Sequence, residues 1–318
     1  MTPEQFEAWK AEGGLDIQDR KAQRSPPIVK LKSETAMQLY TAQGQSVSLE
    51  NHYRGGPGFL VLSGPSSRNL NLGLLKDRGC VTFCVNNSWS LVRPQIWTAV
   101  DDPCTMLDAG WKDPGILKLA PYGKQEARLG TKTEKGFRWS KYRVVDMPNV
   151  LFYKRNTHFK LQEFLTQDSV NWGNDQRITD ELGCQGSRSV MLAAVRLMFY
   201  LGFRTIYLVG ADFHMEDKEG HRYAFPQARD PKAAKGNNNT YRDLNKRFTA
   251  LRPLMEAKGL RILNCNPHSG LKAFDFADFH EVTNKIAGKY EGFHDTDGWY
   301  TWHKAGRKTK LPPGVNPK

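Results

Sequence analysis

The sequence predicts an α/β protein built on a doubly wound, mostly parallel sheet of Rossmann-like type. Short apolar segments bounded by turn residues alternate with helical patterns along the chain, and this alternation is typical of parallel sheets covered by helices on both faces. The chain has 318 residues, of which 39% are hydrophobic, enough for one large buried core.

Six apolar segments of three to five residues are expected to be strands: 59–63, 81–85, 96–100, 150–153, 205–209 and 261–263. Helical patterns lie between several of them, at 70–76, 189–201 and 241–258. The helix over 189–201 is apolar nearly all round, so it should be buried against the sheet. Gly202 should end this helix directly before the next strand.

We expect residues 1–55 to form an extension that ends at a glycine-rich hinge. Residues 56–290 should form a nucleotide-binding catalytic domain with a basic insertion at 112–160 and a small lid at 214–242, and residues 291–318 a basic tail. No apolar run reaches the roughly 20 residues of a membrane span. A cytoplasmic protein is expected, in the host cytoplasm if a phage encodes it.

The net charge of +13 favours a polyanionic partner. Between residues 112 and 160, 12 Lys or Arg face four acids. A solvated basic surface and a polyanion-binding face both fit this segment. The second reading is supported by the aromatic residues interleaved with the charges, Trp111, Tyr122, Phe137, Trp139 and Tyr142.

The sequence lacks several motifs that identify common classes of metal-binding and nucleotide-binding proteins. The five cysteines form no CxxC pair, which indicates reduced thiols, and the histidines lack the spacing of a zinc site. Neither a GxGxxG fingerprint nor a P-loop is found, which argues against a dehydrogenase or a P-loop ATPase.

Polar residues follow the first two predicted strands. Gly64 and Pro65 open a loop in which free N–H groups and the Ser66 hydroxyl could hold phosphate, and an ordinary turn with a serine N-cap is the alternative. Asn86 and Asn87 could read a base or ribose, and an Asx turn is the alternative.

Carboxylates follow two further strands. Of the adjacent pair Asp101 and Asp102, only one should face the cleft, and we expect it to be Asp102, where it could hold a metal. Asp212, followed by His214, ends a buried strand and must meet either a ligand or backbone amides.

The start of the apolar helix is a candidate anion site. Gly186, Ser187 and Ser189 surround Arg188 there, so unpaired N–H groups, hydroxyls and a guanidinium would converge on a phosphate. The alternative is that Ser189 only caps the helix.

Six segments in this order, LVLSGPSSRNL, CVNNSW, VDDP, GSRSVMLAAVRLMFYLGFRTIYLVGADF, RYAFPQ and NCNPHSG, resemble the bacterial sialyltransferases that use a CMP-sugar and the related pterin pyrophosphokinase-like domains. The resemblance covers roughly residues 57–280. It implies a modified GT-A-like fold with a small lid, and sugar transfer without a metal, in a divergent enzyme of phage type.

The resemblance also assigns roles to residues of this chain. Gly64 and Ser66 match the first nucleotide loop, Asn86 or Asn87 the asparagine after the second strand, and Asp102 a nucleotide-contacting position. The phosphate-binding helix start is matched by Ser187 and Ser189, and the strand-end aspartate by Asp212. A segment beside the active site is matched by Tyr223, Ala224 and Phe225, and a motif that approaches the nucleotide by Pro267, His268 and Ser269.

The sequence departs from the family where the general-base histidine should stand, because residues 239–242 read Asn-Thr-Tyr-Arg. The base must then be another residue, and the candidates are His214, His221, His268, Asp102 and Asp212.

Three functions follow as expectations. The first is transfer of a sugar from a nucleotide-sugar donor to the hydroxyl of a polyanionic acceptor, DNA with a hydroxylated base rather than an acidic glycan, with Arg188 stabilising the leaving phosphate and no cofactor required. The second is Mg²⁺-dependent pyrophosphoryl transfer, with Asp102 and Asp212 holding the ion. The third is a non-catalytic nucleic-acid-binding protein on the same scaffold.

Overall fold

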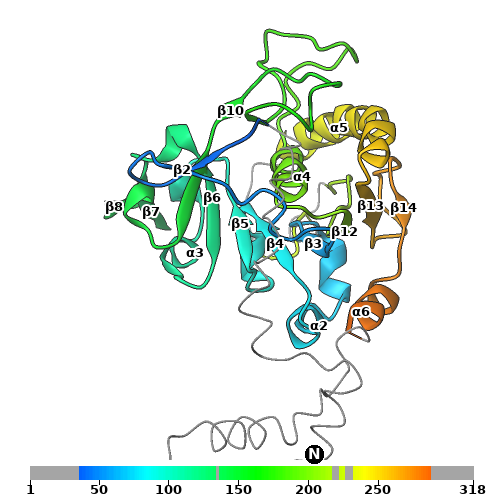
Figure 1. The fold of residues 1–318 in the computed structure, drawn as a ribbon, viewed down its shortest axis with the longest axis horizontal. Coiled ribbons are helices and arrows are strands. Elements are labelled where there is room, and N and C mark those ends of the chain that lie inside the picture. The colour runs from blue at the N-terminus through cyan, green and yellow to red at the C-terminus, as the bar shows by residue number, and fades with distance from the viewer. Residues whose placement is uncertain (1–35, 134–135, 217–221, 226–231, 288–318) are drawn as a thin grey trace, which may run out of the picture. The chain divides into compact units, whose positions relative to one another are not determined.

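The computed structural model describes residues 36–133, 136–216, 222–225 and 232–287. They form an α/β fold around a ten-stranded mixed sheet, Rossmann-like and mostly parallel, with helices on both faces (Figure 1). In sheet order the strands are β14 (Asp275–Phe276), β13 (Arg261–Asn264), β12 (Thr205–Val209), β3 (Pro57–Val61), β4 (Thr82–Val85), β5 (Ile96–Thr98), β6 (Leu117–Pro121), β9 (Val150–Tyr153), β1 (Leu39–Tyr40) and β2 (Ser46–Val47).

The strands from β14 to β9 are all parallel, and β1 and β2 add an antiparallel edge next to β9. Two small sheets lie outside this row. One is an antiparallel hairpin of β7 (Arg128–Thr133) and β8 (Gly136–Arg143), and the other a parallel pair of β10 (Arg155–Asn156) and β11 (Val170–Asn171).

The helices cover the two faces of the sheet. Residues of α4 (Val190–Tyr200) and α5 (Lys232–Ala257) belong to the hydrophobic cluster on one face. Residues of α2 (Gly73–Asp77), α3 (Asp108–Lys112) and α6 (Phe279–Ala287) belong to the cluster on the other. Figure 1 shows these two groups on opposite sides of the strands, which confirms the predicted doubly wound architecture.

The course of the chain reverses between β3 and β12. From β3 it proceeds through β4, β5 and β6 to β9, and then it returns to β12 on the other side of β3 and continues to β13 and β14. In open α/β sheets, ligands bind outside the carboxyl ends of the strands at such a reversal. We call this place the switch point, and the edge where the parallel strands end the carboxyl edge.

The buried helix and the turn after it agree with the sequence prediction. Ten of the 11 residues of α4 are buried. Arg196 is among them, and its guanidinium donates to the Gln167 carbonyl at 2.8 Å. Gly202 has a φ of +100°, and a Cβ there would lie 2.8 Å from the Cα of Asn51, so the turn into β12 requires glycine.

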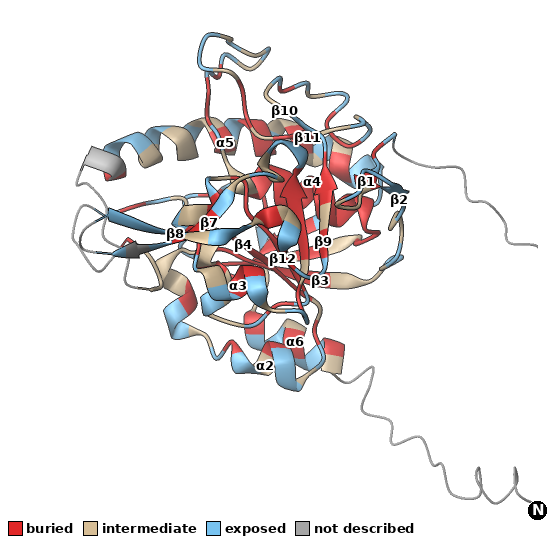
Figure 2. Ribbon diagram, turned by 90° about the vertical axis from the view of Figure 1, so that its left-hand side faces the viewer, coloured by how far each residue is buried: buried red, intermediate tan, exposed pale blue. Residues whose placement is uncertain are grey.

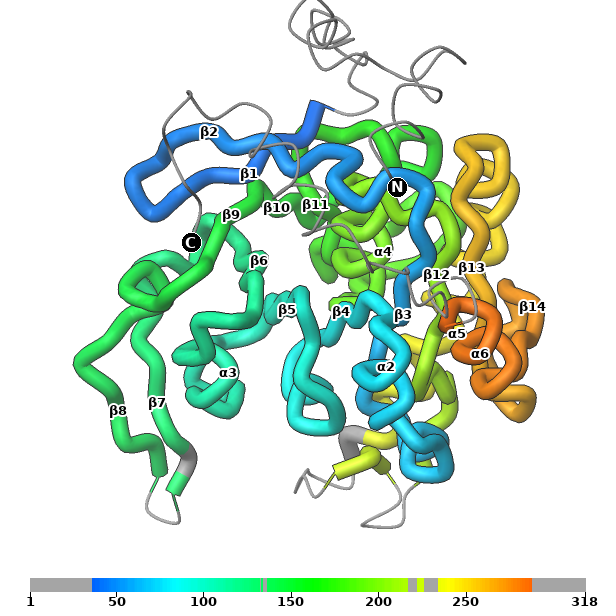
Figure 3. Tube along the Cα trace, turned by 60° about the horizontal axis from the view of Figure 1, so that its bottom comes forward, coloured from blue at the N-terminus to red at the C-terminus, as the bar shows by residue number. Residues whose placement is uncertain are grey.

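Two elements extend past the carboxyl edge. Figure 2 shows the β7–β8 hairpin and the N-terminal end of α5 reaching beyond the sheet on the same side. In Figure 3 the strands follow one another from β9 to β14, and the hairpin projects next to β6. In the described part of the chain, no helix has the length and apolarity to cross a membrane.

The six strands predicted from the sequence are all present, with ends shifted by up to two residues. The strands β6, β7 and β8 were not predicted. Part of the N-terminal extension belongs to the sheet, because β1 and β2 lie within residues 36–55. The cysteines are all free, and four of the five are buried.

Candidate functional site

The loop after β3 is fixed to the end of β12 at the switch point. The N–H of Gly64 donates to the Gly210 carbonyl at 3.0 Å, and the N–H of Ser66 donates to Oδ2 of Asp212 at 3.0 Å. A Cβ at Gly64 would lie 2.4 Å from the Gly210 carbonyl oxygen, closer than any real contact. Glycine is therefore needed for the two strand ends to approach one another.

Asp212 joins three segments. Besides the Ser66 amide, its carboxylate accepts from Nδ2 of Asn266 at 2.6 Å, and its own carbonyl accepts from the N–H of Gly270 at 2.7 Å. The strand ends of β3, β12 and β13 are thus held by one residue. The Asp212 carboxylate thus accepts from one backbone amide and one side-chain amide, and the first of these bonds positions the loop after β3.

The segment after β13 contacts the residues around Asp212. Ser269 is buried, and its hydroxyl donates to the Ala211 carbonyl. Pro267 and His268 are exposed on the same turn, and the N–H of His268 donates to Oδ1 of Asn266 at 2.9 Å.

Residues 223–225, which lie within the predicted lid, contact the loop after β3. The N–H of Ala224 donates to the Ser63 carbonyl at 2.9 Å, and the Arg68 guanidinium donates to the carbonyls of Tyr223 and Ala224. The rings of Tyr223 and Phe225 are stacked with centroids 6.0 Å apart. This segment therefore covers the loop after β3.

Two predicted nucleotide-binding residues carry buried polar atoms without a hydrogen-bond partner among the described residues. They are the hydroxyl of Ser66 and Oδ1 of Asn86. They follow β3 and β4, which are adjacent in the sheet. Because a buried polar atom without a partner costs free energy, these two atoms indicate where a ligand would supply the missing hydrogen bonds.

The two asparagines after β4 differ. Asn86 has a φ of +48°, and its Nδ2 donates to Oδ2 of Asp101 at 3.2 Å. Both polar atoms of Asn87 are bonded to the loop after β5, through the Thr105 carbonyl and the Leu107 N–H. The side chain of Asn87 is thus used to fix a turn, whereas Oδ1 of Asn86 is buried and accepts no hydrogen bond from the described residues.

Of the two carboxylates after β5, Asp101 contacts Asn86, and the Asp102 side chain reaches toward the residues that follow β6. The Asp102 side chain is 71% exposed and forms an ion pair with Lys124. Burial and the charge of Asp102 raise the pKa of the neighbouring Cys104 thiol, which therefore stays protonated and weakly nucleophilic at neutral pH.

The hydroxyls at the start of α4 are already bonded within the protein. Ser189 is the N-cap, and its Oγ accepts from the Met191 N–H at 3.1 Å. The Ser187 hydroxyl donates to Oδ2 of Asp243 at 2.6 Å, with a φ of +48° at Ser187. Arg188 remains exposed, and its guanidinium lies 5.1 Å from the centre of the Trp172 ring.

The candidate histidines lie apart. His214 lines a cavity of about 530 Å³ between the end of β12 and the start of α5, together with Phe213, Lys235, Asn238, Asn239 and Arg242. His268 is exposed on the turn after β13. His221 lies outside the described residues.

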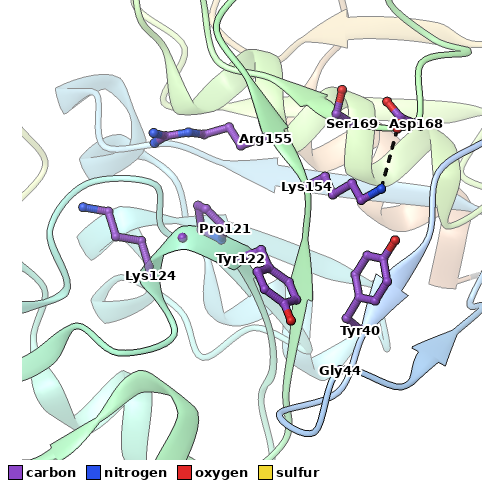
Figure 4. A pocket seen from close by; sticks show the side chains of 10 residues that line it. Tyr40, Gly44, Pro121, Tyr122, Lys124, Lys154, Arg155, Asp168 and Ser169 are labelled. Atoms are coloured by element: carbon purple, nitrogen blue, oxygen red, sulfur yellow. Dashed lines mark ion pairs between the residues drawn. The ribbon is translucent and has the colours of Figure 1, made fainter.

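A larger cavity lies at the ends of β6 and β9, and sequence analysis did not predict it. Its volume is about 930 Å³, and its lining includes the side chains of Tyr40, Tyr122, Lys124, Lys154, Arg155 and Asp168. Figure 4 shows Lys124 and Arg155 reaching toward one side, with Lys154 turned toward Asp168 on the other. Because β6 was not predicted, the residues that follow it did not appear as a strand end.

Asp102 and Asp212 are not brought together. They follow β5 and β12, which are three positions apart in the sheet, or about 14 Å at the usual strand spacing. One Mg²⁺ with ligands at about 2 Å is therefore not shared by both carboxylates. Among the residues that the structure describes, no group of three or more His, Cys, Asp or Glu could hold a metal ion.

A comparison of the chain with family models, curated proteins and solved structures finds no match to any of them.

Proposed function

We propose that this chain is a glycosyltransferase that binds a nucleotide-sugar beyond the ends of β3 and β4 and transfers the sugar to a hydroxyl group of an acceptor. The observation that carries the proposal is the pair of buried atoms without a partner among the described residues at the ends of β3 and β4, the Ser66 hydroxyl and Oδ1 of Asn86. A hydroxyl and an amide oxygen on adjacent strand ends suit the mixed donors and acceptors of a nucleotide.

The rigidity of the loop after β3 supports this placement. The Ser66 N–H donates to the Asp212 carboxylate, and the Gly64 N–H donates to the Gly210 carbonyl. These two bonds hold the loop that carries the Ser66 hydroxyl in position before any ligand binds. Pre-organised groups lose less entropy on binding than mobile ones.

Negative charge on the leaving phosphate requires a cation at the same edge. Because α4 packs on β4 and ends shortly before β12 begins, its first turn lies toward the carboxyl edge. Arg188, exposed at this helix start, supplies the guanidinium, and the dipole of α4 acts in the same direction.

Two of the candidate bases combine an exposed side chain with a neighbouring cavity. Asp102 is paired with Lys124, which lines the cavity at β6 and β9, and His214 lines the cavity at α5. The exposed Asp102 carboxylate stands between the proposed donor site and the cavity at β6 and β9, where it can accept the proton of an acceptor hydroxyl. In this proposal Asp102 is the base.

A thermal-shift panel of CMP-, UDP-, GDP- and TDP-sugars and ATP, each with and without Mg²⁺, tests the proposal. We expect one class of nucleotide-sugar to raise the melting temperature, without a need for Mg²⁺, and the Ser66→Ala variant to lose that response. Ser90→Ala is the control, because the Ser90 hydroxyl is exposed and donates to the Asn87 carbonyl at the surface.

Two results would overturn the proposal. One is a panel in which no nucleotide-sugar changes the melting temperature. The other is a response to ATP alone, dependent on Mg²⁺ and accompanied by release of AMP, which is the result expected of pyrophosphoryl transfer.

A further inference from the structure

The cavity at the ends of β6 and β9 has the chemistry of a site for an anionic ligand that carries a ring. Three cationic side chains, Lys124, Lys154 and Arg155, line it against one carboxylate, Asp168. Its volume of about 930 Å³ lies within the range of small-molecule sites and is large enough for a nucleotide.

Two tyrosine rings also line this cavity. Tyr40 and Tyr122 meet edge to face with ring centroids 5.6 Å apart, and Tyr122 is exposed. Next to it, the Arg155 guanidinium lies 4.7 Å from the centre of the Trp172 ring, which Arg188 also approaches. Rings next to cations are the combination that binds a base together with its phosphate.

The β7–β8 hairpin continues this chemistry over an exposed surface. Phe137, Trp139 and Tyr142 on β8 are 40%, 55% and 43% exposed. Phe137 and Trp139 are two residues apart and so share a face, with ring centroids 5.8 Å apart. Arg128, Arg138 and Lys141 are exposed on the same hairpin, and no Asp or Glu lies among its described residues, so these rings stand among cationic side chains.

The hairpin begins at the wall of the cavity. Its base is tied to the segment that follows Lys124 by two backbone bonds of 3.0 Å, from the Val144 N–H to the Ala127 carbonyl and from the Val145 N–H to the Gln125 carbonyl. A ligand lying along the hairpin therefore meets the cavity without leaving the protein. Such a continuous basic and aromatic surface fits a polymer better than a free nucleotide.

The order of the strands places this surface relative to the proposed donor site. The unpartnered atoms follow β3 and β4, Asp102 follows β5, and the cavity follows β6 and β9. At about 4.8 Å per strand, the end of β4 and the end of β6 are about 10 Å apart. A sugar fits into that interval, with Asp102 beside it.

From this arrangement we infer that the cavity and the β7–β8 hairpin form the acceptor site, and that the acceptor is a single strand of nucleic acid. The exposed rings stack on unpaired bases, which a duplex keeps inside its own stack. The lysines and arginines neutralise the phosphates. The strand lies along the hairpin, and one of its nucleotides enters the cavity.

The transfer step rests on the proposed function. The acceptor hydroxyl oxygen forms a bond to the anomeric carbon of the sugar while the bond from that carbon to the phosphate oxygen breaks. The electron pair leaves with the nucleotide phosphate next to Arg188, and the hydroxyl proton passes to the Asp102 carboxylate.

Fluorescence polarisation of labelled oligonucleotides of about a dozen residues tests the binding, because single-strand sites span roughly 4 to 16 nucleotides. Single-stranded DNA, single-stranded RNA of the same sequence and the DNA duplex are compared at two salt concentrations, without a nucleotide-sugar. We expect a single strand to bind more tightly than the duplex, with an affinity that falls steeply with salt.

Variants of exposed aromatic residues locate the binding surface. Trp139→Ala and Tyr122→Ala should each weaken single-strand binding about tenfold, the usual cost of losing one stacked base. Phe276→Ala is the matched control, since Phe276 is 51% exposed but lies on β14 at the opposite edge of the sheet, and it should leave binding unchanged. Circular dichroism and melting temperature show whether each variant is folded.

The inference is overturned if no single strand is retained at low salt, if the duplex binds more tightly, or if Trp139→Ala and Phe276→Ala behave alike. The Ser66→Ala variant separates this inference from the proposed function. This variant should lose the response to a nucleotide-sugar and keep its oligonucleotide binding, because Ser66 lies outside the proposed acceptor site. If the unsubstituted protein binds oligonucleotides but no nucleotide-sugar, the nucleic-acid surface is supported and the transferase is refuted. A response to a nucleotide-sugar without oligonucleotide binding does the reverse.

Discussion

Replacing Ser66 by alanine should stabilise the free protein and weaken its binding of a nucleotide. The Ser66 hydroxyl is buried and has no partner among the described residues, whereas the N–H of Ser66, which an alanine retains, donates to Asp212. The substitution therefore removes an unsatisfied group and leaves the loop anchored.

The magnitudes follow from hydrogen-bond energetics. An unsatisfied buried hydroxyl costs about 1–3 kcal/mol, so its removal should leave the free energy of unfolding unchanged or raise it by about 1 kcal/mol. In the complex, the lost bond is worth about 1 kcal/mol to a neutral partner and up to 3 kcal/mol to a phosphate. Nucleotide affinity should fall about 5- to 150-fold.

Ser88→Ala provides the contrast. The hydroxyl of Ser88 is fully buried, donates to the Val61 carbonyl at 2.7 Å and accepts from the Val85 N–H at 3.0 Å. The same change of one oxygen atom should therefore lower the free energy of unfolding by about 1–3 kcal/mol.

Urea unfolding measures the stability of both variants, and isothermal titration with the nucleotide-sugar selected by the thermal-shift panel measures affinity. If Ser66→Ala destabilises the protein as much as Ser88→Ala, the Ser66 hydroxyl has a partner within the fold, and the argument for a ligand at the switch point fails.

Three further predictions concern the scaffold. Arg247→Met leaves the fully buried Asp180 carboxylate without the guanidinium 2.8 Å away and should lower the free energy of unfolding by about 3–5 kcal/mol in urea, a result that a change below 1 kcal/mol would contradict. Gly64→Ala forces a Cβ to within 2.5 Å of Oδ2 of Asp212 and should cost about 1–3 kcal/mol and the thermal-shift response to nucleotide. Burial lowers the pKa of Lys118 from 10.5 to about 8, so the unfolded chain holds this proton more tightly between those values and stability should rise with pH there, by at most about 1.4 kcal/mol per pH unit. Lys118→Met should lack that rise when urea unfolding is compared at pH 8 and pH 10.

The fold was predictable to the extent that it depends on continuous apolar segments. Buried parallel strands such as β3, β4 and β12 appear as short apolar runs, and α4 appears as an apolar helix that ends in glycine. The strand β6, Leu117–Pro121, was missed because Lys118 interrupts it. That lysine is buried and donates to three backbone carbonyls, a solution that only the tertiary structure reveals.

The hairpin was missed for a different reason. Its strand β8, Gly136–Arg143, is polar or exposed throughout and so has no buried face to create an alternating pattern. The sequence showed its charge and its aromatic residues but not its shape.

The sequence predicted which residues of the candidate site lie at strand ends, but it did not predict their hydrogen-bond partners. The residues expected near a nucleotide follow β3, β4, β5 and β12 at one edge of the sheet, as proposed. Which polar atoms remain open depends on partners distant in sequence. Asp212 meets Ser66 across 146 positions, and Ser187 meets Asp243 across 56. No local pattern distinguishes such bonded side chains from the open ones of Ser66 and Asn86.

Helix α5 connects the two most unusual backbone positions of this edge. Of the described non-glycine residues with positive φ, Ser187 and Phe213 are the ones that are not asparagine, and this conformation is costly for both. Each is held from α5, since the Ser187 hydroxyl bonds to Asp243 and the Phe213 ring stacks on Tyr241 with centroids 5.2 Å apart. Asp243 and Tyr241 lie within one turn of this helix. The start of α4 and the end of β12 are therefore held by the same turn of α5, the helix that also lines the cavity at His214.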